Sequence, residues 1–271
     1  MKAMIFAAGL GTRLKPITDM LPKALVPVCG KPLIEHVVRR LKSAGIDKAV
    51  VNVHHFADKV EAWVAAQDLM AISVSDERHM LLETGGAVLH AREYLEGCGH
   101  FLIHNVDILS NADLNWLQSE VKPEALATLM VSERETTRFL LFEPETMRLV
   151  GWHNTDSGAH HLADDSIALE DCRALGFSGI HILSDKVLDL MDEYARSRNL
   201  PVEDPTGVKF SIMNFYLWAA AKYPIYGVVA KDLNFLDVGK LDALAPAEEF
   251  VNSKTDSTGI QKIKSITLNQ G

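Results

Sequence analysis

A glycine-rich segment near the start of the chain, residues 7–13 (Ala-Ala-Gly-Leu-Gly-Thr-Arg), contains the residue types that bind phosphate. Gly9 and Gly11 let the backbone approach a ligand closely and point its N–H groups at it. Thr12 adds a hydroxyl group, and Arg13 adds a forked cation that matches phosphate oxygens. The segment lacks the Gly-Lys-Ser/Thr of a Walker loop and the third glycine of the dinucleotide fingerprint. It therefore predicts a phosphate-binding turn of another kind, or simply a tight turn between a strand and a helix.

A local excess of positive charge surrounds this segment. Residues 1–31 contain five basic side chains and a single acid, a net charge of +4, whereas the whole chain has a formal net charge of −9. The cluster indicates either an anion-binding site or a chance grouping on a solvated surface, and composition leaves both open. Lys23 stands out because it lies between Pro22 and the apolar run 24–28.

Two aspartates follow apolar runs elsewhere in the chain. Asp107 ends the segment 101–107 (Phe-Leu-Ile-His-Asn-Val-Asp), and Asp237 lies within 235–239 (Phe-Leu-Asp-Val-Gly). Mg²⁺ takes one or two carboxylates together with phosphate oxygens and water. Ligands of open α/β sheets bind at the carboxyl ends of the strands, where both acids are expected. An aspartate after a strand is also a common helix cap or turn former, so the acids alone do not settle a metal site.

The elements that must position these residues alternate between strand and helix in the first half of the chain. Apolar runs that end in a glycine-rich or polar segment are typical of buried parallel strands. The alternation predicts an α/β fold, a Rossmann-like, mainly parallel mixed sheet covered by helices on both faces. Strands are expected at 2–7, 48–53, 71–75 and 100–106, and helices at 32–44, 56–66 and 86–95.

The second half has a less regular pattern. Strands are expected at 126–132, 138–142, 175–183 and 225–230, and helices at 185–195, 212–221 and 241–250. Residues 154–165 are polar and include Gly158, which predicts a turn or loop. We expect a single domain over residues 1–251, with a nucleotide half at about 1–110 and an acceptor half at about 111–251. A polar C-terminal tail, 252–271, is expected to fray.

Three linked motifs in the N-terminal segment resemble the signature of the sugar-1-phosphate nucleotidylyltransferases. They are A-A-G-x-G-T-R-L-x-P-x-T from Ala7, P-K-x-L-V-P-V from Pro22 and G-K-P from Gly30. The family includes mannose-1-phosphate guanylyltransferases, glucose-1-phosphate uridylyl- and thymidylyltransferases and N-acetylmuramate-1-phosphate uridylyltransferases. The resemblance implies a Mg²⁺-dependent enzyme that joins a nucleoside triphosphate to a sugar 1-phosphate and releases pyrophosphate. Direct attack on the α-phosphorus needs no protein nucleophile.

The resemblance also implies roles for individual residues. Arg13 would hold the triphosphate and Lys23 would lie near the α-phosphate, where two preorganised cations stabilise the charge that develops. Asp107 and Asp237 would hold Mg²⁺. The residues expected along the nucleotide are Ala7, Ala8, Gly9, Gly11, Thr12, Thr84, Gly85 and Asn105.

The acceptor side departs from the family pattern. The segment 175–181 is similar to the family's strand along the sugar pocket, where Gly179 would let the backbone meet sugar hydroxyls. The Glu-Lys-Pro element that many relatives use near the sugar phosphate is absent, and Glu170 or Arg173 could replace it. Asn214 stands where relatives often carry an acid. These departures leave base and sugar open, with GTP and mannose 1-phosphate, or UTP and a hexose- or muramate-type 1-phosphate, as the leading pairs.

Composition excludes several other classes of protein. The acidic net charge disfavours binding to nucleic acid or to an anionic membrane. The three cysteines are far apart, which indicates a reducing compartment and disfavours a disulfide framework or a zinc site. No apolar stretch approaches the ~20 residues of a membrane span, and the N-terminus reads as a strand rather than a signal peptide. A cytoplasmic location is therefore expected, whereas the oligomeric state has no indication in the sequence.

Two other functions remain open at this point. A phosphocholine-type cytidylyltransferase would share the fold and need a cage of aromatic and acidic side chains for a quaternary ammonium. A non-catalytic nucleotide-sugar-binding regulatory protein would be expected to lack Arg13, Lys23 or the two aspartates, all of which are present.

Overall fold

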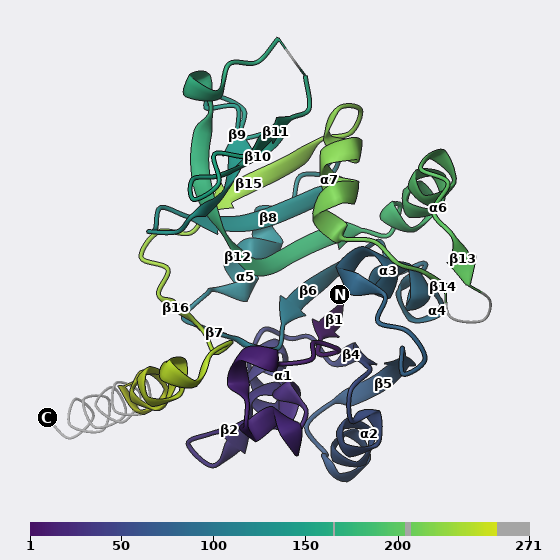
Figure 1. Cartoon of the computed structure of the whole chain (residues 1–271), viewed down its shortest axis with the longest axis vertical. Helices are drawn as coiled ribbons and strands as arrows, with labels where there is room; N and C mark the ends of the chain where they lie inside the picture. Colours follow the sequence, from purple (N-terminus) through teal and green to yellow (C-terminus); the bar gives the residue numbers. More distant parts are fainter. Residues whose placement is uncertain (165, 204–206, 254–271) are drawn as a thin grey trace, which may run out of the picture.

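A central mixed sheet of ten strands organises the molecule (Figure 1). The computed structural model describes residues 1–164, 166–203 and 207–253. The strand order is β11-β10-β9-β12-β6-β1-β4-β5, and β8 pairs with both β12 and β15. The strands are β1 (Lys2–Phe6), β4 (Lys48–Val53), β5 (Ala71–Asp76), β6 (His100–Asn105), β8 (Ala127–Ser132), β9 (Arg138–Phe142), β10 (Leu149–Asn154), β11 (His160–Leu162), β12 (Arg173–Ser184) and β15 (Ile225–Val229).

Short strands and helices surround the sheet. The short strand pairs are β2 (Pro27–Val28) with β3 (Lys31–Pro32), β7 (Ile108–Ser110) with β16 (Phe235–Asp237), and β13 (Val202–Glu203) with β14 (Gly207–Val208). The α-helices are α1 (Leu33–Ser43), α2 (Ala57–Ala66), α3 (Glu83–His90), α4 (Arg92–Leu95), α5 (Leu114–Ser119), α6 (Val187–Ser197) and α7 (Ile212–Ala220), and residues 244–253 are also helical. The 3₁₀ turns are η1 (Thr12–Leu14), η2 (Ile17–Asp19), η3 (Lys23–Leu25), η4 (Leu169–Asp171) and η5 (Leu241–Ala243).

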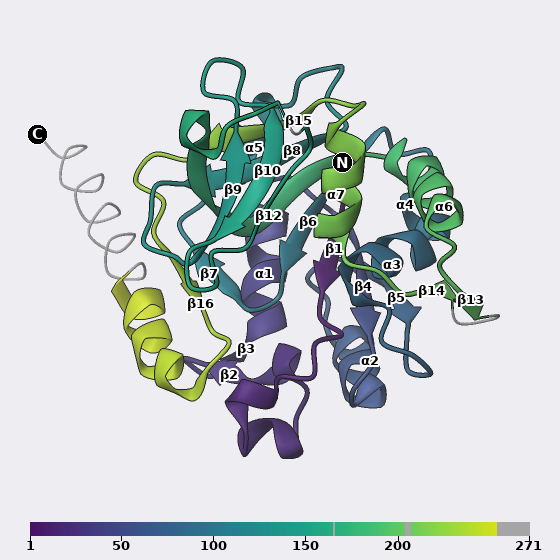
Figure 2. The same ribbon diagram turned by 45° about the horizontal axis from the view of Figure 1, so that its top comes forward.

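Helices cover both faces of the sheet, as predicted. Successive side chains of a strand point to opposite faces, so Ala3 and Ile5 pack into a cluster with α1, α2 and α5, whereas Met4 packs into a second cluster with α3, α6 and α7. Figure 2 shows α3, α6 and α7 close together on one side of β12. The α/β class with a mixed sheet is therefore confirmed.

Parallel pairing is concentrated in the four strands β6-β1-β4-β5. The register places Phe6 beside both Asn52 and Asn105, so these three strands end at one edge of the sheet. The loops that follow them start side by side. Antiparallel β12 then joins this unit to β8 and β9.

The structure corrects several predicted elements. The segment 154–165, predicted as a loop, includes the short strand β11, which pairs with β10, and Gly158 has a φ of +69° between them. The predicted helix 86–95 is two helices, α3 and α4, and α3 begins at Glu83. Residues 252 and 253 continue the last helix instead of belonging to a frayed tail, whereas the rest of the predicted tail lies outside the described residues.

None of the helices in the described ranges combines the length and the apolar character that a membrane span requires.

Candidate active site

The segments that follow β1, β5 and β6, together with Asn52 near the end of β4, border a hollow of about 400 Å³ at the carboxyl edge of the parallel strands. Four of the predicted nucleotide-binding residues line it, together with both members of an ion pair. The lining residues used below are Ala8, Gly9, Lys23, Asn52, Thr84, Asn105 and Asp107. The N-terminal motif and the acid after β6 therefore meet at one site.

Glycine stands at two positions of the loop after β1 for different physical reasons. Gly11 has a φ of +63°, and a Cβ atom there would lie 2.8 Å from Cγ2 of Thr18, so both conformation and space favour glycine. Its carbonyl accepts a hydrogen bond from Oγ1 of Thr18 at 2.8 Å. A Cβ atom on Gly9 would meet nothing within 4 Å. Gly9 therefore leaves the floor of the hollow open, whereas Gly11 shapes the turn that leads to Arg13.

A largely buried ion pair joins the loop to β6. Lys23 begins η3 after Pro22, and its Nζ binds Oδ2 of Asp107. The two side chains are 11% and 19% exposed, so solvent screens their attraction little. Removing one partner would leave the other charge buried without compensation.

Two short strands bring the second aspartate to the first. Asp237 lies opposite Ile108 in the β7–β16 pair, and the N–H of Val238 donates to the Asp107 carbonyl at 2.8 Å. Partial burial, and then the neighbouring Asp107 carboxylate, raise the pKa of Asp237 above its usual range. The predicted aspartates therefore face each other.

Arg13 joins this acidic pair from the glycine-rich loop. A Cβ atom on Gly239 would lie 2.6 Å from Oδ1 of Asp237 and 2.7 Å from Nη2 of Arg13. The two side chains therefore meet over Gly239, and both residues keep a solvent-exposed part. Each of the predicted cations thus lies against one of the predicted acids, Lys23 against Asp107 and Arg13 against Asp237.

The two carboxylates fit a hard divalent cation. Their oxygens are the ligand type that Mg²⁺ prefers, and a cation between them would relieve the repulsion that raises the pKa of Asp237. Within the described ranges, no group of three histidine, cysteine or acidic side chains is placed to hold a metal ion. Asp107 and Asp237 would therefore need phosphate oxygens or water to complete the coordination.

A buried hydrogen-bond chain fixes the loop after β1, which the sequence predicts to bind the nucleotide, and no pattern in the sequence predicted this chain. Oδ1 of Asn52 accepts from the N–H of Ala7 at 2.8 Å, and Nδ2 of Asn52 donates to Oε1 of Glu77 at 2.9 Å. Oε2 of Glu77 accepts from the N–H of Leu82 at 3.3 Å. Burial raises the pKa of Glu77 to about 7, although the hydrogen bonds that Glu77 accepts from Asn52 and Leu82 lower it. The chain ties the loop after β1 to the segment that leads into α3.

Thr84 and Gly85, both predicted to lie along the nucleotide, contact residues 210–212. Oγ1 of Thr84 accepts from the N–H of Ile212 at 3.0 Å, and the N–H of Gly85 donates to the Phe210 carbonyl at 2.9 Å. A Cβ atom on Gly85 would lie 2.3 Å from the Phe210 ring. Thr84 therefore lines the hollow, whereas the structure explains Gly85 by close packing.

The predicted acceptor residues divide into two groups. Gly179 has a φ of +76°, and a Cβ atom there would lie 2.7 Å from Nδ2 of Asn105, so it adjoins the hollow. Glu170 and Arg173 lie outside the described lining of this hollow, and Nη2 of Arg173 donates to Oε1 of Glu133 at 2.7 Å. A nearer cation is Arg134, in the loop after β8, whose charge interacts with that of Asp237.

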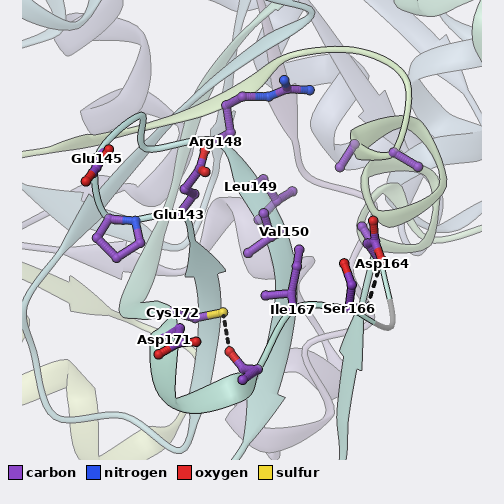
Figure 3. Close-up of a pocket in the computed structure, with 15 residues that line it drawn as sticks. Glu143, Glu145, Arg148, Leu149, Val150, Asp164, Ser166, Ile167, Asp171 and Cys172 are labelled. Atoms are coloured by element: carbon purple, nitrogen blue, oxygen red, sulfur yellow. Dashed lines mark hydrogen bonds between the residues drawn. The ribbon is translucent and has the colours of Figure 1, made fainter.

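A second hollow, of about 760 Å³, lies between the β9–β10 hairpin and the segment around η4 (Figure 3). Its described lining has one guanidinium, Arg148, against four carboxylates, which would repel a phosphate. The acids are Glu143, Glu145, Asp164 and Asp171. Phosphate chemistry therefore favours the first hollow.

Comparison with known proteins gives matches over most of the chain. Residues 2–143 match the protein family described as nucleotidyl transferase. The N-acetylmuramate alpha-1-phosphate uridylyltransferase of Caulobacter vibrioides is 33% identical over 254 residues, which cover 91% of this chain and 95% of the relative. The protein of the same description from Neisseria meningitidis serogroup B is 31% identical over 208 residues, covering 74% of this chain and 83% of the relative.

Solved structures show the same fold. The UDP-glucose pyrophosphorylase from Acinetobacter baumanii matches with a TM-score of 0.72 at 18% sequence identity, covering 100% of this chain and 99% of the other. At that identity the structural match bears on the fold, whereas the sequence matches bear on the family.

Proposed function

The chain belongs to the nucleotidyl transferase family, as a sugar-1-phosphate nucleotidyltransferase, and we propose that it transfers the uridylyl group of UTP to an N-acetylmuramate-type sugar 1-phosphate. The choice of UTP and of this acceptor is supported by the two uridylyltransferases whose matches extend over most of the chain. The observation that carries the proposal is the meeting of Lys23, Asp107, Asp237 and Arg13 beside the glycine-lined hollow.

The proposed reaction is a direct in-line transfer. A phosphate oxygen of the sugar 1-phosphate forms a bond to the α-phosphorus of UTP, and the bond from that phosphorus to the bridging oxygen of the β-phosphate breaks. Pyrophosphate leaves with the electron pair of that bond, and UDP-sugar remains. Binding both substrates in line supplies much of the rate enhancement, because a bimolecular step becomes effectively unimolecular.

The cations of the site act on the phosphates. Lys23 donates to an oxygen of the α-phosphate, which it reaches by leaving its place beside Asp107. Arg13 binds the β- and γ-phosphates and stabilises the leaving pyrophosphate with its forked donors. When bound by Asp107 and Asp237, Mg²⁺ supplies further positive charge to the triphosphate oxygens.

The nucleotide lies along the loop after β1. Ala8, Gly9, Gly11 and Thr12 present backbone N–H groups and a hydroxyl to it, and Ala7 precedes them with its own N–H bound to Asn52. Thr84, Gly85 and Asn105 border the base and ribose. This is one catalytic domain in which residues 1–110 bind the nucleotide and residues 111–251 the acceptor. Because nucleoside triphosphates and sugar phosphates are charged metabolites of the cytoplasm, we place the reaction there.

A substrate panel tests the proposal. Pyrophosphate release is measured with Mg²⁺ for each of ATP, CTP, GTP, UTP and dTTP, crossed with N-acetylmuramate, N-acetylglucosamine, glucose and mannose 1-phosphates and phosphocholine. The expected result is release with UTP and N-acetylmuramate 1-phosphate above all other pairs. Preference for GTP with mannose 1-phosphate would contradict the base and sugar, and release only with CTP and phosphocholine would contradict the acceptor class.

A further inference from the structure

An acceptor phosphate needs a cation of its own. The attacking phosphate carries up to two negative charges and must approach a triphosphate that is already anionic, so an unscreened approach is repulsive. The proposed function assigns Lys23 and Arg13, which lie against Asp107 and Asp237, to the triphosphate. Arg173 is held by Glu133 through an ion pair of 2.7 Å. Another cation on the acceptor side is therefore required.

We infer that Arg134 is a specificity-determining residue that binds the phosphate of the acceptor sugar 1-phosphate. This assignment rests on the proposed function and adds a residue that the N-terminal motif does not contain. Arg134 follows β8 on the acceptor half and is exposed, so a substrate can reach it.

Three contacts fix the direction of the Arg134 side chain. Its Nη2 donates to the Phe177 carbonyl at 3.2 Å. Its Cζ lies 4.7 Å from the centre of the Phe235 ring, a cation–π distance. A Cβ atom on Gly176 would lie 2.6 Å from its Nε, so the absence of a side chain at Gly176 makes room for the arginine. The guanidinium is thereby held between β12 and β16.

The same contacts place the guanidinium beside the proposed metal ligands. Phe235 and Asp237 belong to the three-residue strand β16. Partial burial lowers the pKa of Arg134, and the negative charge of Asp237 opposes this shift. Among the ion pairs of the described residues, Arg134 has no carboxylate partner within 4.0 Å, unlike Arg173. Nη1 donates to the Glu135 carbonyl at 3.5 Å and Nη2 to the Phe177 carbonyl, so Nε–H and the second N–H of each terminal nitrogen are available to an anion.

This arrangement suits a phosphate monoester. An arginine fork can donate two parallel hydrogen bonds to one phosphate while the aromatic ring supports its other face. Bound in this way, the acceptor phosphate would lie next to Asp237, across the acidic pair from Lys23. Arg134 would orient the attacking oxygen toward the α-phosphorus and reduce the repulsion between the two substrates.

Kinetics of an arginine series test the inference. Pyrophosphate release from UTP and N-acetylmuramate 1-phosphate is measured while each substrate is varied in turn. Arg134→Ala is expected to raise the KM for the sugar phosphate roughly 10- to 100-fold, since hydrogen bonds to a charged group are lost. The KM for UTP should stay unchanged. Arg134→Lys, which keeps the charge and loses the fork, should fall between wild type and Arg134→Ala.

Two control variants separate phosphate binding from a general effect. Arg138→Ala removes an exposed arginine from the neighbouring strand β9 and should leave both KM values unchanged. Arg173→Ala tests the rival cation and should likewise leave the acceptor KM unchanged. Thermal melting verifies that each variant is folded, and Arg134→Lys decides the question if Arg134→Ala does not fold.

The outcomes that overturn the inference are distinct from those that overturn the function. An unchanged acceptor KM in Arg134→Ala, or equal rises in both KM values, would contradict the role of Arg134 alone. A larger acceptor effect from Arg173→Ala would reassign the phosphate to Arg173. If folded wild-type protein released no pyrophosphate with any pair in the substrate panel, the proposed function would fail and the role of Arg134 with it.

Discussion

The proposed nucleotide side and the proposed acceptor side of the site are built by different means. On the nucleotide side, buried polar groups fix the loops: Asn52 and Glu77 connect the backbone at Ala7 to that at Leu82, and Lys23 is buried against Asp107. On the acceptor side, the proposed phosphate ligand is an exposed arginine, held by two backbone carbonyls and one ring. Single changes should therefore damage folding and catalysis together on the nucleotide side, and substrate affinity alone on the acceptor side.

The largest expected effect comes from the Lys23–Asp107 pair. Lys23→Met should lower kcat by about 10²- to 10³-fold, because a preorganised donor to the transferring phosphoryl group is lost. It should also destabilise the fold by about 3 kcal/mol, since Asp107 is left unpaired. Initial rates of pyrophosphate release measure the change in kcat, and urea unfolding measures the change in stability.

A double variant separates the two effects on the nucleotide side. Lys23→Met with Asp107→Leu replaces both charges, so the unfolding free energy should recover toward wild type while activity stays lost. Recovery of activity in this variant would show that the pair is only a structural contact.

The next effect concerns the pH dependence of stability. Burial raises the pKa of Glu77 to about 7 from 4.5, so the folded protein holds a proton that the unfolded chain releases between these pH values. The contribution of Glu77 to the free energy of unfolding is fully present below pH 4.5 and is lost as the pH rises to about 7. The free energy of unfolding should therefore fall by about 3 kcal/mol across this pH range. Urea unfolding of wild type and of Glu77→Gln over this range measures the difference. Parallel curves for the two proteins would contradict the assignment.

Exchanging the donor and the acceptor of the buried hydrogen bond between Asn52 and Glu77 tests whether this bond positions the nucleotide loop. In Glu77→Gln the new amide N–H₂ must face either Nδ2 of Asn52 or the N–H of Leu82, and in Asn52→Asp two carboxyl groups meet. Each single variant should raise the KM for UTP roughly tenfold, because an unsatisfied buried group costs about 1–3 kcal/mol. In the double variant, the amide introduced by Glu77→Gln can donate to the carboxylate introduced by Asn52→Asp, so much of the loss should be recovered.

A double-mutant cycle on the KM for UTP measures this coupling. Additive effects of the two substitutions would show that the chain from Ala7 to Leu82 does not position the nucleotide loop. The acceptor KM serves as the internal control and should change little in all three variants.

The smallest expected effects distinguish the two loop glycines. Gly11→Ala should destabilise the fold by about 1 kcal/mol or more, because its φ is +63° and the Cβ atom would crowd Thr18. Gly9→Ala should leave the unfolding free energy unchanged, since nothing lies within 4 Å, while weakening UTP binding. Thermal melting and calorimetric titration with UTP measure the two quantities. Equal losses of stability would contradict the separate roles.

The residues of the proposed nucleotide side that meet at the hollow could be identified from the sequence because their signals are local. The spacing of Gly9, Gly11 and Arg13 lies within one loop, and the apolar runs before Asn52 and Asp107 identify the strands that carry them. The parallel strands and the carboxyl edge followed from these patterns. The buried role of Glu77 could not be predicted, because an acid just after a strand has the same local pattern whether it is exposed or buried.

The acceptor side depends on contacts between distant segments. The pairing of β7 with β16, which brings Asp237 to Asp107, involves strands of three residues that give no recognisable alternation. Arg134 and Arg173 are indistinguishable by residue type and by proximity to a strand. Only the tertiary structure shows that Arg173 pairs with Glu133, whereas Arg134 lies over Phe235.

A comparison of two lysines from the same basic segment tests the proposed active site most directly. Pyrophosphate release from UTP and N-acetylmuramate 1-phosphate is measured for wild type, Lys23→Ala and Lys31→Ala. Lys23 is buried beside Asp107, whereas Lys31 is exposed on β3, outside the described lining of the hollow. We expect a loss of turnover of at least about 10²-fold for Lys23→Ala and none for Lys31→Ala. Equal turnover in all three folded proteins would contradict the proposed active site.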